Sequence, residues 1–62
     1  MKTHKPLKQI SVTNPSFQEG YMAGMNDPGF ITATQPEKIN NPYPDKSMDA
    51  ENYEAGYRAA IH

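Results

Sequence analysis

Hydrophobic and small residues recur at three- and four-residue steps in two stretches of the chain, residues 15–26 and 49–61. The first stretch ends before Pro28-Gly29, because proline cannot continue a helix and glycine readily takes turn geometry. The residues that share one face of the second stretch are Tyr53, Gly56, Tyr57, Ala60 and Ile61. The pattern predicts two short helices.

Capping residues indicate where each predicted helix begins. Asn14 caps the first helix if Pro15 is its first residue, whereas Ser16 with Glu19 three residues later would form a capping box. Both starts give the same helix. Asp49 is the expected cap of the second.

Four prolines divide the connector, residues 27–48, and no alternating pattern there is long enough for a strand. The expected fold is therefore all-α, a small helical hairpin of two short helices joined by a long Pro-rich connector. We expect residues 15–62 to form one small helical domain after a basic flexible tail, residues 1–14. Four hydrophobic residues are expected to hold the connector down: Phe30, Ile31, Ile39 and Tyr43.

The two predicted helices share a motif at a fixed offset of 36 residues: Phe17-Gln18-Glu19-Gly20-Tyr21-Met22-Ala23-Gly24 aligns with Tyr53-Glu54-Ala55-Gly56-Tyr57-Arg58-Ala59-Ala60. A glycine inside a helix costs up to about 1 kcal/mol relative to alanine, and close helix packing is a sufficient reason for it. The aromatic residues of the motif serve either that packing or a recognition surface. The predicted packing residues are Phe17, Gly20, Tyr21, Gly24, Tyr53, Gly56, Tyr57 and Ala60.

The chain is short of core-forming side chains. Leu, Ile, Val and Phe together make 8 of its 62 residues, and it has no cysteine for disulfides or thiolate ligands. Stability must then come from helix packing or from a partner, and the protein is expected to be a monomer or a homodimer.

Charge divides the chain into a basic start and an acidic remainder. Residues 1–10 carry +3 from Lys2, Lys5 and Lys8, whereas residues 11–62 contain three cations and seven acids, hence −4. The first residues lack the apolar run of a targeting signal, and no stretch could span a membrane, so we expect a cytoplasmic protein.

No pattern indicates catalysis, a metal or a cofactor. Asp45-x-Ser47-x-Asp49 begins like a calcium loop, but its later positions lack the required glycine and glutamate. The two histidines stand near opposite ends, and so small a core is not expected to enclose a nucleophile and its base. We expect a non-enzyme.

Asn41-Pro42-Tyr43-Pro44 is a candidate surface feature, because two prolines restrict the backbone around one aromatic side chain. This segment either presents Tyr43 to a partner or forms a rigid turn with Tyr43 tucked onto the helices.

Three motifs in order resemble the ribosome modulation factor family, which includes the CrpP-type small proteins: Gly20-Tyr21-Met22-Ala23-Gly24, Asn41-Pro42-Tyr43 and Tyr53-x-x-Gly56-Tyr57-Arg58-x-Ala60. The resemblance covers about residues 17–61. It implies two short helices joined by a long connector, and binding to the ribosome near the messenger-binding region of small-subunit RNA.

Two functions from different classes follow. As a ribosome-associated regulator of translation, the chain would place Lys2, Lys5, Lys8 and Arg58 on RNA phosphates, with Tyr43 or Tyr57 available for stacking. Alternatively, it is an acidic protein-binding regulator or inhibitor of a host protein, such as a phage or mobile-element accessory protein. That protein would present its acidic face or the Pro42-Tyr43-Pro44 segment.

Overall fold

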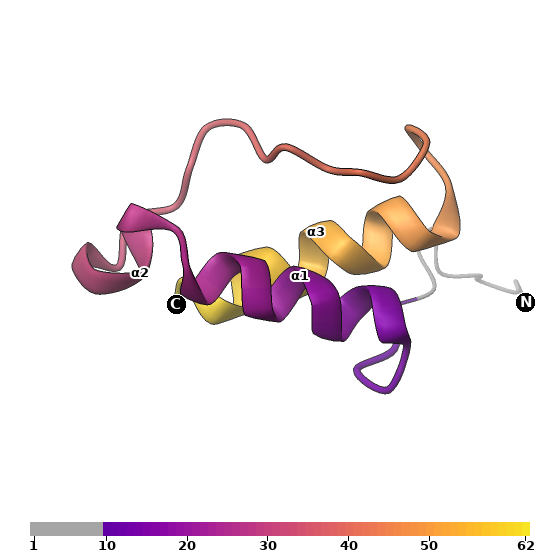
Figure 1. Cartoon of the computed structure of the whole chain (residues 1–62), viewed down its shortest axis with the longest axis horizontal. Coiled ribbons are helices and arrows are strands. Elements are labelled where there is room, and N and C mark those ends of the chain that lie inside the picture. The colour runs from indigo at the N-terminus through magenta and orange to yellow at the C-terminus, as the bar shows by residue number, and fades with distance from the viewer. Residues whose placement is uncertain (1–9) are drawn as a thin grey trace, which may run out of the picture.

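Three helices make up the fold in the computed structural model, which describes residues 10–62 (Figure 1). They are α1 (Pro15–Met25), α2 (Pro28–Thr32) and α3 (Met48–Ala60). No strand occurs between residues 10 and 62, so the all-α prediction is confirmed. The predicted basic residues Lys2, Lys5 and Lys8 lie outside the described residues.

Each helix begins at a side chain that accepts a hydrogen bond from its first turn. Asn14 caps α1, its Oδ1 accepting from the Ser16 backbone N–H at 2.8 Å, with Pro15 as the first helical residue. Ser47 caps α3, its Oγ accepting from the Ala50 N–H at 3.1 Å. The prediction of Asp49 as this cap was wrong, because Ser47 two residues earlier already supplies the oxygen. Asp49 lies in the first turn, where a carboxylate favours the positive end of the helix dipole.

Helix α2 lies inside the segment predicted to be connector. Asp27 caps it by accepting from the Gly29 N–H at 2.7 Å, and Ala33 ends it in the left-handed conformation at φ 58°. The Pro28-Gly29 pair therefore ends α1 and also starts a new helix. Five residues are too few for a periodic hydrophobic pattern, which is why the sequence did not reveal this element.

The two long helices run in the same direction, and this corrects the expected hairpin (Figure 1). At their N-terminal ends the Ser16 hydroxyl donates to the Asp49 carboxylate at 3.0 Å, and at their C-terminal ends Gly24 lies against Ala60. The connector returns along the length of α3 to start it beside the beginning of α1 (Figure 1). Helix α3 is only about 20 Å long, so the fifteen residues between the helices, 33–47, can span it easily.

Glycines bring the two helix backbones together in a repeated manner. A Cβ atom on Gly20 would overlap the carbonyl oxygen of Tyr53, and one on Gly56 would overlap the carbonyl oxygen of Phe17. The 36-residue offset exchanges these two contacts, because it relates Gly20 to Gly56 and Phe17 to Tyr53. The repeated motif therefore forms a pseudo-two-fold helix pair, each glycine facing the backbone of the other copy.

Few side chains are buried by this arrangement. The buried hydrophobic residues within the described part of the chain are Ala50, Tyr53, Ala60 and Ile61. Asn52 is fully buried beside them, where its Oδ1 accepts from the Ser11 N–H at 2.8 Å and its Nδ2 donates to the Met48 carbonyl at 2.9 Å. Ser11 belongs to the predicted tail, and this bond holds its backbone against α3.

Candidate functional site

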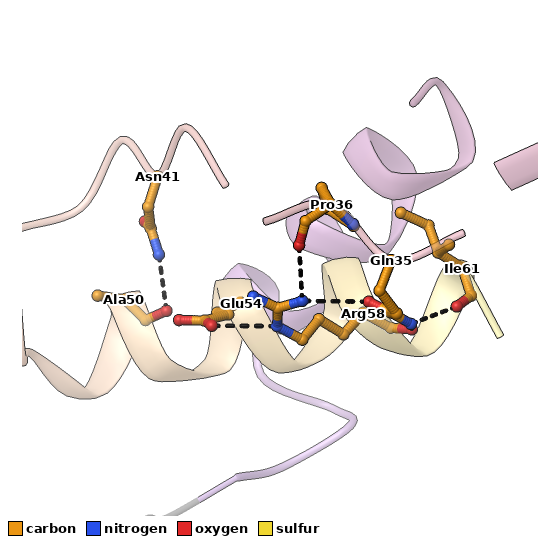
Figure 2. Close-up of polar contacts among 7 residues, drawn as sticks. All are labelled: Gln35, Pro36, Asn41, Ala50, Glu54, Arg58 and Ile61. Atoms are coloured by element: carbon orange, nitrogen blue, oxygen red, sulfur yellow. Dashed lines mark hydrogen bonds and ion pairs between the residues drawn. The ribbon is translucent and has the colours of Figure 1, made fainter. Parts of the chain in front are cut away.

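Arg58 ties the connector to α3 (Figure 2). Its Nη1 donates to the Gln35 Oε1 and to the Pro36 carbonyl, both at 3.2 Å, and its Nε lies 3.1 Å from the Glu54 carboxylate. These three acceptors use most of the N–H donors of the guanidinium group. The predicted phosphate-binding residue is thus occupied in holding the protein's own chain, although its side chain is 38% exposed.

Two side-chain amides complete this attachment (Figure 2). Gln35 donates from Nε2 to the Arg58 carbonyl at 3.0 Å and also to the Ile61 carbonyl, and Asn41 donates from Nδ2 to the Ala50 carbonyl at 2.8 Å. The last carbonyls of a helix lack partners within the helix, so Gln35 satisfies groups that would otherwise need water. The connector therefore serves as the C-terminal cap of α3.

Tyr43 is tucked onto the helices. Its ring meets the Tyr53 ring edge-on at 5.9 Å between centroids, and its hydroxyl donates to the Glu19 carboxylate. That hydrogen bond is the main cause that raises the pKa of Tyr43 to about 12. The Asn41 Oδ1 also accepts from the Tyr43 N–H at 3.0 Å, which fixes the turn around Pro42. Of the two alternatives for this segment, the geometry is that of the rigid turn.

Tyr57 makes an equivalent bond at the other end of the helix pair. Its hydroxyl donates to the Asp27 carboxylate, which raises the pKa of Tyr57 to about 12. The same bond, followed by the one from the Gly29 N–H, lowers the pKa of Asp27. The two tyrosines predicted to stack on bases thus bind carboxylates of the protein itself.

The connector and α3 enclose an open groove of about 760 Å³. Its charged lining residues are Lys38, Asp45, Lys46, Glu51 and Glu54. Because these charges have both signs, the groove does not attract ligands of one sign. Between residues 10 and 62 no three acidic or histidine side chains are placed to hold a metal ion.

Five of the eight exposed large hydrophobic side chains in the described part of the chain lie on α1 and α2. Tyr21, Met22 and Met25 share one face of α1 by their three- and four-residue spacing, and they are 42%, 65% and 47% exposed. Phe30 and Ile31 on the next helix, α2, are also exposed, at 42% and 87%. We call these five residues the α1–α2 surface.

The α1–α2 surface overturns two sequence interpretations. Phe30 and Ile31 were expected to hold the connector down, but the short helix α2 turns both toward solvent, leaving Ile39 and Tyr43 as the partly buried ones. Tyr21 was expected in the helix contact and lies at its exposed edge. One signal in the sequence could have indicated this surface: residues 20–35 contain five large apolar side chains and a single charge, Asp27.

None of the described helices is long and apolar enough to cross a bilayer. No family model, no curated protein and no solved structure matches this chain.

Proposed function

We propose that this chain is a small, non-catalytic regulator that binds another protein through its α1–α2 surface. The observation that carries the proposal is the exposure of five large apolar side chains in a segment with one charge. That charge, on Asp27, is held by the Tyr57 hydroxyl and the Gly29 N–H. Surfaces of this kind, apolar with two adaptable methionines, are typical of protein recognition.

Charge supports a protein partner over a nucleic acid. Residues 11–62 carry −4, and Arg58, one of their three cations, is paired with Glu54. Binding to RNA depends mainly on cations that neutralise phosphates, and an acidic surface repels the same phosphates. The two remaining cations, Lys38 and Lys46, share their groove with three carboxylates.

The resemblance to the ribosome modulation factor family supports a related fold more than a shared site. Its quoted residues are those that bring the helices together, such as Gly20 and Gly56, or that fix the connector, such as Asn41 and Arg58. Fold and function are inherited separately, because a site depends on the surface that a fold presents. Ribosome association through Lys2, Lys5 and Lys8 is therefore the competing outcome of the test below.

The test is capture of a partner by the tagged full chain at low and at moderate salt, with matched surface variants. Met22→Lys and Ile31→Lys each place a charge in the α1–α2 surface, and Val12→Lys is the control because Val12 is equally exposed, at 66%, but lies before α1. We expect the wild type and Val12→Lys to retain the same protein at both salt concentrations, and the two surface variants to lose at least about tenfold in affinity.

Two results would contradict this function. One is salt-sensitive sedimentation with ribosomal subunits that Lys2→Ala, Lys5→Ala and Lys8→Ala together abolish, since this would assign the activity to RNA. The other is a captured protein whose binding Met22→Lys and Ile31→Lys leave unchanged. Far-UV circular dichroism of every variant shows whether it is folded.

A further inference from the structure

We propose that two copies of this chain pair through the α1–α2 surface when no partner is bound, so that self-pairing competes with partner binding. That self-pairing competes with a partner rests on the proposed function, whereas the pairing of two copies does not depend on it. The occupant of the free surface is thus a second copy of the chain.

The first argument is the small size of the core. The buried hydrophobic residues of the described part are two alanines with Tyr53 and Ile61, while eight larger hydrophobic side chains are exposed in it. Chains below about 70 residues usually add disulfides, a structural metal or oligomerisation to such a core. This sequence has no cysteine, and residues 10–62 contain no cluster that could hold a metal. Of these three sources of added stability, oligomerisation is the one still open to the described part of this chain.

The second argument is charge. In a two-fold dimer the same patch meets itself, so any charge within it faces its own copy and repels it. Residues 11–62 contain seven acids, and six of them lie outside residues 20–35. The seventh, Asp27, is engaged by Tyr57 and Gly29. Glu19, which lies three residues before Met22 on α1, accepts a hydrogen bond from the Tyr43 hydroxyl. Two acidic chains can therefore approach through the α1–α2 surface without opposing carboxylates that lack a hydrogen-bond donor.

The exposed side of α3, in contrast, carries several charged side chains that would face their own copies in a dimer. Its first turn carries Asp49 and Glu51, and the ion pair of Glu54 with Arg58 follows one turn later. Pairing through that helix would bring like charges together, and the connector already covers part of it (Figure 2). Self-pairing through α1 and α2 leaves the Glu54–Arg58 ion pair and the connector's hydrogen bonds to α3 intact.

Salt dependence follows from the same charges. Two copies that each carry a net negative charge repel at long range, and added salt screens this repulsion. The dimer should therefore tighten as salt rises. A patch of five side chains is small beside a standard interface, so we expect a dissociation constant of about 10 µM or weaker.

The test is sedimentation equilibrium of the full chain, without partner, from about 10 µM to about 1 mM. We expect the wild type and Val12→Lys to pass from the 6.9 kDa monomer to twice that mass, and Met22→Lys to remain monomeric. Met22→Glu alone should also be monomeric. An equimolar mixture of Met22→Lys and Met22→Glu should recover the dimer, because opposite charges then meet across the interface.

Three results of the sedimentation experiment would contradict the proposed dimer. A wild type that stays at 6.9 kDa at the highest concentration excludes it. A dimer that Met22→Lys and Val12→Lys form equally well places the contact elsewhere, as does a dimer that added salt dissociates. Because Met22 is 65% exposed, its substitution leaves the helix contact untouched, and circular dichroism confirms folding independently.

The pairing and the proposed function fail separately. A monomeric wild type that still retains a partner through Met22 and Ile31 overturns the pairing alone. A dimer that recovers no partner leaves the pairing in place and overturns the function. If both hold, the apparent affinity for the partner should fall as the concentration of the chain passes its dimer dissociation constant.

Discussion

Alanine in place of Gly20 or Gly56 should destabilise the protein, although alanine is the better helix former. The Cβ atom added at Gly20 would overlap the Tyr53 carbonyl oxygen, and the one added at Gly56 would overlap that of Phe17. These are backbone atoms of a helix, so they cannot rotate away as a flexible side chain could. The helices must separate, and the contacts around Tyr53 must loosen.

The size of the effect is a difference of two terms. Overpacking of a fitted contact costs about 1–3 kcal/mol, and a clash with a helix backbone belongs at the upper end. Alanine returns up to about 1 kcal/mol of helix propensity. The free energy of unfolding should then fall by about 2 kcal/mol, which lowers the melting temperature of so small a domain by about 8–16 °C. Gly24→Ala should cost less, because its Cβ would lie 2.5 Å from the Tyr57 oxygen, a milder overlap.

Thermal and urea unfolding followed by far-UV circular dichroism measure these differences. Gln18→Ala and Gln18→Gly form the matched control, because Gln18 is exposed on the same helix and their difference reports propensity alone. The pseudo-two-fold contact also predicts that Gly20→Ala and Gly56→Ala together cost less than the sum of both, since the first substitution already separates the helices. The difference in unfolding free energy between Gln18→Ala and Gln18→Gly measures the gain from helix propensity alone. If Gly20→Ala stabilises the protein by that same amount, the added Cβ atom causes no clash and the reasoning is wrong.

Three further predictions follow from other contacts. Ser16→Cys with Asp49→Cys should form a disulfide on mild oxidation, because these side chains touch at 3.0 Å where both helices begin. Asn52→Ala should lower the free energy of unfolding by about 1–3 kcal/mol, because it removes a fully buried amide that bonds the Ser11 N–H and the Met48 carbonyl. Tyr57→Phe should flatten the pH dependence of thermal stability at both extremes. The raised pKa of Tyr57 gives stability that is present below pH 10 and lost as pH rises towards 12, and the lowered pKa of Asp27 gives stability that is lost as pH falls below about 4.

Each of these predictions has its own control. Ser16→Cys with Ala60→Cys joins ends that meet only in an antiparallel hairpin, and rapid disulfide formation in this pair would contradict the parallel arrangement. Asn40→Ala removes an exposed amide and should change stability by less than about 0.5 kcal/mol. A pH profile of Tyr57→Phe that matches the wild type at both extremes would show that its bond to Asp27 contributes nothing.

Local features of the fold were predictable because they depend on neighbouring residues. Helical spacing gave α1 and α3 within one or two residues, and Asn14 was one of two caps expected for α1. The paired glycines Gly20 and Gly56 predicted a close helix contact without any knowledge of the partner. Such features need only steric rules and the period of the helix.

The direction of the second helix was not predictable in this way. Small residues one turn apart allow two backbones to approach in either orientation, and a connector of about twenty residues reaches both ends of a short helix. The deciding contacts are distant in sequence: Ser16 with Asp49, and Gln35 with the carbonyls of Arg58 and Ile61. The exposure of Phe30 and Ile31 depended in turn on α2, which is too short to leave a pattern.

The two copies of the repeated motif form the same contact twice in the parallel helix pair. Because both segments have the same pattern of small and aromatic residues, a two-fold axis along the parallel pair relates the contacts of one segment to those of the other. In that arrangement Gly20 meets Tyr53 and Gly56 meets Phe17, so these four motif residues hold the two helices together. We therefore expect the proposed binding of a partner to depend on side chains that the repeat does not constrain. Met22 and Ile31 meet that condition, because Met22 aligns with Arg58 and Ile31 lies outside the motif.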